Sequence, residues 1–207
     1  MPSKPRDHSH TRSPQSFRRH QDLREIKQRF LIVCEGMETE VKYFEGFKMP
    51  GRLVRIEGIG KDPVKVVAAM TKLRANKFAG EEFEQCWCVF DTDGRSPRVL
   101  ENAVTAAAAK GYRIAYSNEA FELWYLLHFH YHDARLSRDA YGDLLSGLLG
   151  RPYDKAGDYF QELMSKQETA IKNAKRLMSS YRDHQKPHGC CPGTTVHLLV
   201  EELNKNT

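Results

Sequence analysis

The sequence predicts an α/β fold with a mainly parallel, four-stranded sheet flanked by helices and followed by a helical C-terminal extension. Three observations support this prediction: short apolar runs recur along the chain, segments with helical periodicity alternate with them, and the links are short. Parallel strands need a crossover helix between them, and strands buried on both faces are apolar throughout instead of alternating with polar residues. The 207 residues, 40% of them hydrophobic, are enough for one domain with its own core.

Four segments are expected to form the strands. Phe30–Cys34 and Cys86–Phe90 are continuous apolar runs, and the segments Leu53–Ile56 and Tyr112–Tyr116 complete the set. Polar or glycine-containing turns end them, such as Glu35-Gly36 after the first strand. The alternation of these strands with helices indicates βαβ units, in which all strand carboxyl ends point to the same edge of the sheet.

Helices are expected between the strands and after them. Asp62-Pro63 is typical of an N-cap followed by proline at the first helical position, and Ser117-Asn118 is predicted to cap a helix that carries Phe121 to Leu127. The other predicted helices cover residues 39–47, 63–74, 99–110, 144–149, 168–181 and 195–203.

Charge divides the chain into a basic arm and a neutral body. Residues 1–29 contain eight basic and three acidic residues and so carry the whole surplus of +5, whereas residues 30–207 contain 24 of each. We expect a disordered arm over 1–29 and a single domain over 30–207, with a sheet core at 30–130 and the helical extension at 131–207. The arm would either bind polyanions or only increase solubility.

Neither membrane insertion nor export is indicated. The longest apolar runs are far shorter than the roughly 18 residues that cross a bilayer, and the N-terminus lacks the apolar region of a secretory signal. Five cysteines, an odd number, do not suggest a disulfide framework. The expected location is the cytoplasm.

Acidic residues follow two of the predicted strands. Glu35 comes directly after the first strand, and Asp91 and Asp93 follow the third. Ligands of open parallel sheets bind beyond the carboxyl ends of the strands, so these carboxylates are expected at the functional edge. Clustered carboxylates repel one another, and a hard divalent cation relieves that repulsion. The sequence therefore predicts a site for Mg²⁺ or Mn²⁺ held by Glu35, Asp91 and Asp93.

A strand followed by Glu35-Gly36, and a later strand followed by Asp91-Thr92-Asp93, resembles the Toprim signature of topoisomerases, primases and several nucleases. The chain resembles more closely the RloB family, small Toprim-type proteins of bacterial and archaeal defence loci. The matching stretches are Leu31-Ile-Val-Cys-Glu-Gly36 with Thr39-Glu40 and Tyr43-Phe44, then Phe90-Asp-Thr-Asp93, then Ser117-Asn118 with Phe121-Glu-Leu-Trp124 and Leu127-His-Phe129, and finally Thr194 to Leu203. The sequence departs from the family at Glu119, where proline is frequent, and at Cys191-Pro192-Gly193, where an Asn-Pro pair is usual.

The resemblance implies a Toprim-like fold and a metal-dependent nuclease, or related phosphodiester hydrolase, that acts on DNA or RNA in anti-phage or mobile-element defence. Glu35 would be a general acid or base or a metal ligand, and Asp91 and Asp93 would hold Mg²⁺. Arg95, Asn118, Glu122 and Lys155 are the candidate substrate-binding residues, and Glu40 is a further candidate at the same edge. Nucleic acid is the expected partner, together with a protein of the same defence locus such as an ATPase, and a homodimer is compatible with such sites.

Two other functions fit the same residues. A non-catalytic adaptor could use the acidic site to bind nucleic acid or a nucleotide without turnover, and a phosphatase could act on small molecules without needing the arm. Two other motifs are weak metal-site candidates. The histidines of the segment His128–His132 are expected to be core or surface residues. The spacing of a zinc site is missing from His184, His188, Cys190 and Cys191. No P-loop or complete dinucleotide-binding motif is present.

Overall fold

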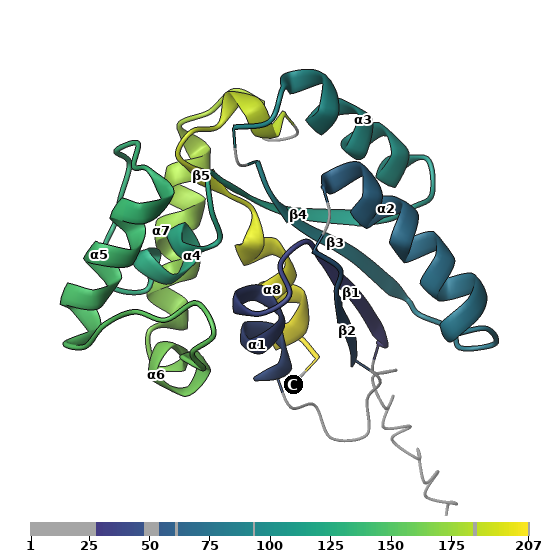
Figure 1. Ribbon diagram of the computed structural model, residues 1–207, viewed down its shortest axis with the longest axis horizontal. Helices are drawn as coiled ribbons and strands as arrows, with labels where there is room; N and C mark the ends of the chain where they lie inside the picture. Colours follow the sequence, from purple (N-terminus) through teal and green to yellow (C-terminus); the bar gives the residue numbers. More distant parts are fainter. Residues whose placement is uncertain (1–27, 48–53, 61, 93, 184–185, 207) are drawn as a thin grey trace, which may run out of the picture.

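The computed structural model describes residues 28–47, 54–60, 62–92, 94–183 and 186–206. They form three layers, with a twisted sheet between two groups of helices (Figure 1). Residues 1–27 of the basic arm, Asp93 and His184 lie outside the described residues. Among the described residues, no helix is both long and apolar enough to span a bilayer.

The sheet has five strands in the order β2-β1-β3-β4-β5. The strands are β1 (Phe30–Cys34), β2 (Val54–Gly58), β3 (Gln85–Asp91), β4 (Arg113–Asn118) and β5 (Gly193–Thr194). The first four are parallel, and β5 is antiparallel to β4. The mixed α/β class is as expected, but the predicted number of four strands is wrong. A two-residue strand is too short to give a periodic pattern in the sequence.

Eight α-helices accompany the sheet in the described part of the chain. They are α1 (Thr39–Glu45), α2 (Pro63–Lys72, continued by a π-helical turn over Leu73–Lys77), α3 (Pro97–Ala108), α4 (Glu122–Leu127), α5 (Arg138–Leu149), α6 (Phe160–Met164), α7 (Gln167–Ser179) and α8 (Val196–Asn204). A short 3-10 helix covers Pro187–Gly189. The predicted N-cap at Asp62 is present, because its side chain accepts a hydrogen bond from the Lys65 amide at 3.0 Å.

Each face of the sheet is covered by apolar side chains of a different group of helices. In β1, Phe30 and Ile32 face the core formed with α1, α4, α7 and α8, whereas Leu31 and Val33 face the core formed with α2 and α3. Figure 1 shows α2 and α3 on one side of the sheet and α1 and α8 on the other. Burial on both faces explains why β1 and β3 are continuous apolar runs.

The predicted helix cap at Ser117-Asn118 is wrong, because both residues belong to β4. They pair with Thr194 and Gly193 of β5, and the Ser117 and Thr194 hydroxyls are 3.0 Å apart. The helix begins only at Glu122. This pairing partner lies more than 70 residues away in the sequence, so the local pattern of polar residues followed by apolar ones could not reveal it.

The direction in which successive strands are added to the sheet reverses between β1 and β3. From β1 the chain passes through α1 on one face to β2, and from β3 it passes through α3 on the opposite face to β4. Helices that leave two neighbouring parallel strands on opposite faces diverge and open a crevice at the strand carboxyl ends. The crevice of this sheet therefore lies where β1 and β3 end.

Candidate active site

Glu35 and Asp91 lie at this crevice. Glu35 follows β1, and its amide donates a hydrogen bond to the Val89 carbonyl of β3 at 2.8 Å. Asp91 is the last residue of β3. Both line a cavity of about 390 Å³, together with residues of α1, of α4 and of the C-terminal extension. Its walls are Glu35, Gly36, Met37, Glu38, Thr39, Glu40, Gly60, Asp91, Phe121, Glu122, Arg138 and Lys155.

Two further buried carboxylates share this cavity. Glu40 lies in the first turn of α1, and Glu122 is the first residue of α4. Burial raises the pKa of Asp91 well above its usual range, and the negative charges of Glu40, Glu122 and Glu35 add to this effect, whereas Arg138 opposes it. Burial also raises the pKa of Glu40, with Glu122 and Glu35 as further causes. The four carboxylates thus form one electrostatically coupled cluster.

An arginine neutralises each of the two carboxylates that end a strand. Arg138 Nη2 donates to Asp91 Oδ2 at 2.7 Å, and Arg95 Nη2 donates to Glu35 Oε1 at 2.5 Å. Arg95 follows the turn after β3, where its amide donates to the Thr92 carbonyl at 2.8 Å. Hydrogen bonds between two charged groups are the strong ones, so both arginines hold their carboxylates in fixed positions.

The C-terminal extension supplies a third cation. Lys155 Nζ lies 3.7 Å from Glu122 Oε1, and the Tyr153 hydroxyl donates to the same oxygen at 3.4 Å. Helix α1 fixes this segment, because the Thr39 hydroxyl donates to the Lys155 carbonyl at 3.0 Å and the Lys42 ammonium group donates to the Ala156 carbonyl. The extension is thus one wall of the cavity and not a separate appendage.

The structure brings together most of the candidate residues. Glu35, Glu40, Asp91, Glu122 and Lys155 line one cavity, and the side chain of Arg95 contacts Glu35. Asn118 does not line the cavity, since its buried amide donates to the Pro187 carbonyl at 3.1 Å. Asp93 lies outside the described residues.

Sequence analysis did not identify Arg138 and Tyr153. One local signal exists for Arg138: Ser137 caps α5 by accepting the Ala140 amide at 3.4 Å, which places Arg138 at the first helical position. Nothing near it in the sequence indicates that this helix end faces β3. Tyr153 precedes Lys155 by two residues, so the resemblance that identified the lysine could have drawn attention to it.

The histidine His128 has a structural role in the core. It is buried, its Nδ1 lies 2.8 Å from the Trp124 carbonyl, and burial lowers its pKa to about 4. The imidazole is therefore neutral at physiological pH, as expected for a core histidine.

The acidic cluster has the donor chemistry for a magnesium ion. Carboxylate oxygens are the ligands that Mg²⁺ prefers, and mutual repulsion among the four acids is what a divalent cation relieves. In the described residues, no three Asp, Glu, His or Cys side chains already converge to hold a metal ion. Asp91 and Glu35 each direct an oxygen to an arginine, so a metal would have to take the place of these contacts.

Comparison with known families gives a match to a family model described as RloB-like protein, over residues 30–203. The chain belongs to the RloB-like family. The match begins at β1 and ends in α8, so it includes both strands that carry the motif acids and the extension that carries Arg138 and Lys155. Comparisons with curated proteins and with solved structures gave no match.

Proposed function

We propose that this RloB-like protein is a Toprim-type, Mg²⁺-dependent nuclease or related phosphodiester hydrolase. The observation that supports this most strongly is the position of Glu35 and Asp91 at the ends of adjacent parallel strands, where α1 and α3 diverge. Two motifs that lie 56 residues apart in the sequence thus contribute to one cavity. A site that combines four carboxylates with arginine and lysine side chains suits a phosphodiester substrate bound through a metal.

Asp91 and Glu35 are the proposed metal ligands, with Asp93 as a further ligand from the loop after β3. A bound Mg²⁺, or Mn²⁺, would stabilise negative charge on the phosphate oxygens and lower the pKa of a water molecule. Arg95 and Lys155 provide cations that can hold non-bridging phosphate oxygens. Glu40 is the best-placed residue to carry a proton, because its pKa is raised and it borders the same cavity.

The proposed substrate is DNA or RNA, and the proposed setting is the cytoplasm of a cell that defends itself against phage or mobile elements. The basic arm supports a nucleic-acid substrate, because its positive charges would add salt-dependent affinity for the backbone. A protein of the same locus, such as an ATPase, and a second copy of the chain are proposed as partners that would regulate or complete the enzyme. These proposals follow from the family membership and the charge of the arm.

A non-catalytic adaptor is the second candidate, and one observation favours it. Both motif carboxylates already have an arginine as counter-charge, so neither of the two needs a metal to compensate its charge. In an adaptor these ion pairs would persist, and the cavity would bind a phosphate or nucleotide without turnover.

A cleavage assay separates the two candidates. Mixed single- and double-stranded DNA and RNA are incubated with the protein and with Mg²⁺, Mn²⁺ or EDTA, and Asp91→Asn and Glu35→Gln variants are tested beside it. The nuclease predicts metal-dependent products that both variants fail to form while they keep their circular-dichroism spectrum. A well-folded Asp91→Asn protein with full activity would contradict the proposed site.

A further inference from the structure

We propose that Arg138 exchanges partners during the reaction cycle: it occupies Asp91 in the metal-free protein and moves to the substrate phosphate when Mg²⁺ binds. This inference rests on the proposed metal-dependent function. It assigns to a residue of the C-terminal extension two successive roles, as a competitor of the metal and as a specific contact for a phosphate group.

The position of the guanidinium supports the first role. Arg138 Nη2 lies 2.7 Å from Asp91 Oδ2, within the space that a cation bound to this oxygen would need. The Asp91 side chain is only 7% exposed, and four further carboxylates line the same cavity. A buried carboxylate without a counter-charge is costly, so in the absence of metal the arginine provides the charge that a metal would otherwise provide.

The mobility expected of Arg138 supports the second role. Its side chain is 40% exposed and begins at the first residue of α5, and Arg138 belongs to neither of the two apolar cores, so its movement uncovers neither of them. Arg138 also lines the cavity, and it therefore stays within reach of a ligand bound there. A planar guanidinium can donate two parallel hydrogen bonds to a phosphate, which a lysine cannot.

The charges around the cavity favour such an exchange. When all groups are ionised, the carboxylates Glu35, Glu38, Glu40, Asp91 and Glu122 exceed the cations Arg95, Arg138 and Lys155 by two negative charges. A divalent cation cancels this excess, which weakens the attraction of the cavity for the nearby guanidinium and lowers its repulsion of a phosphodiester. Metal binding thus weakens the Arg138–Asp91 pair and prepares Arg138 for a phosphate.

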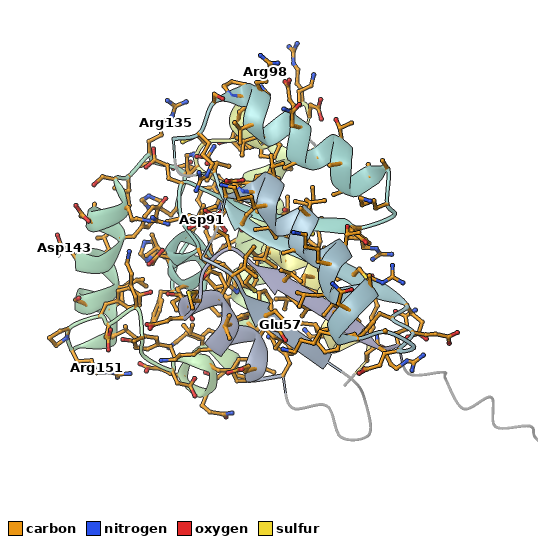
Figure 2. All side chains as sticks on the ribbon, turned by 45° about the vertical axis from the view of Figure 1, so that its right-hand side comes forward. Glu57, Asp91, Arg98, Arg135, Asp143 and Arg151 are labelled. Carbon is orange, nitrogen blue, oxygen red and sulfur yellow. The ribbon has the colours of Figure 1, made fainter. Side chains whose placement is uncertain are left out.

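Helix α5 offers a matched control. Arg151 follows the other end of this helix and pairs with Glu162 at 2.7 Å, the same separation as in the Arg138–Asp91 pair. Figure 2 shows Asp91 in the interior of the molecule and Arg151 at its periphery. Substitution of Arg151 therefore removes an ion pair of the same length, although a more exposed one, at a residue that does not line the cavity.

The test measures Mg²⁺ binding to the full-length protein by titration calorimetry for the wild type, Arg138→Gln, Arg138→Lys and Arg151→Gln. We expect Arg138→Gln to bind Mg²⁺ about tenfold more tightly, because the competing charge is gone. Arg138→Lys, which keeps the charge, and Arg151→Gln should both stay within about twofold of the wild type. With Mg²⁺ saturating, Arg138→Gln should bind inorganic phosphate about tenfold more weakly than the wild type.

The outcomes distinguish a failure of the Arg138 exchange from a failure of the proposed metal-dependent function. Equal Mg²⁺ affinity of the wild type and Arg138→Gln would overturn the exchange and leave Arg138 as a structural ion pair. Absence of Mg²⁺ binding by the wild type would overturn the proposed function itself, and the exchange with it. If Arg138→Gln does not fold, the side-chain Nε resonance of Arg138 in the wild type is followed by NMR during a Mg²⁺ titration. It should shift while that of Arg151 stays constant, and an unchanged Arg138 resonance would overturn the exchange.

Discussion

The carboxylate of Glu40 lies directly over Gly36, so closely that a β-carbon on this glycine would be 2.0 Å from Glu40 Oε2. The backbone of Gly36 also provides a hydrogen bond that favours the ionised form of Glu40. A glycine follows Glu35 because a side chain at this position would occupy the space of the Glu40 carboxylate. The Glu35-Gly36 and Thr39-Glu40 motifs form one structural unit at the end of β1.

Gly36→Ala is expected to displace the Glu40 carboxylate while the fold is retained. The three atoms nearest to the added methyl group all belong to the flexible end of Glu40, which can rotate away. We expect the free energy of unfolding to change by only about 1 kcal/mol and the rate of phosphodiester cleavage to fall about 100-fold. Chemical denaturation and single-turnover kinetics would measure the two effects. A fully active Gly36→Ala protein would show that the position of Glu40 is irrelevant to the chemistry.

The raised pKa values of Glu40 and Asp91 predict a pH dependence of stability. Both groups bind protons more readily in the folded state than in the unfolded state, where carboxyl pKa values are near 4. Their contribution to the free energy of unfolding therefore decreases as the pH rises from about 4 toward the raised values.

Glu40→Gln removes one of these titrating groups. In metal-free buffer, its stability relative to the wild type should therefore be greater at pH 8 than at pH 4.5. Urea denaturation at both pH values measures this, with the exposed Asp143→Asn as control. A stability difference between Glu40→Gln and the wild type that is the same at both pH values would be inconsistent with a buried Glu40 whose pKa is raised.

Lys155 and Lys175 form a matched pair for testing the cationic wall of the cavity. Both pair with a glutamate, and their side chains are 56% and 54% exposed, but only Lys155 lines the cavity. Lys155→Met should lower the cleavage rate about 10- to 100-fold, because a cation next to the phosphate is lost. Lys175→Met should cleave at the wild-type rate. Equal rates for the two variants in steady-state assays would exclude Lys155 from substrate binding.

The basic arm should affect affinity more than catalysis. Residues 1–27 contain seven basic and three acidic residues, whereas Gln28 and Arg29 contact the folded domain through Asn206 and Glu84. Removal of residues 1–27 should weaken nucleic-acid binding and reduce the slope of log K against log salt by about one for each lost phosphate contact. Fluorescence anisotropy over a salt series measures both quantities. An unchanged slope would show that the arm does not contact the backbone.

Local sequence patterns predicted the elements that are buried on both faces. The limits of β1 agree with the prediction, and β3 extends the predicted strand by one residue at each end. Glu35, Asp91, Glu122 and Lys155 could be named from motifs, because turns and motif residues are local features of the sequence.

Elements and contacts that depend on distant partners could not be predicted. Strand β5 exists because Thr194 pairs with Ser117, and α6 is only five residues long. The same limit applies to Arg138 of α5, whose partner Asp91 lies on β3, 47 residues earlier. One of the three cations of the cavity, Arg138, could therefore not be identified from any spacing in the sequence.

The central claim is that the carboxylates at the ends of β1 and β3 hold a divalent cation, and a Mg²⁺ titration followed by thermal unfolding tests it most directly. A ligand at about 100 times its Kd stabilises the folded state by about 2.7 kcal/mol. For a protein of this size, such a stabilisation raises the Tm by about 5 to 10 °C. The wild type and the exposed control Asp143→Asn should show this rise. Glu35→Gln and Asp91→Asn should not. An Asp91→Asn protein whose Tm rises with Mg²⁺ as much as that of the wild type would contradict the claim.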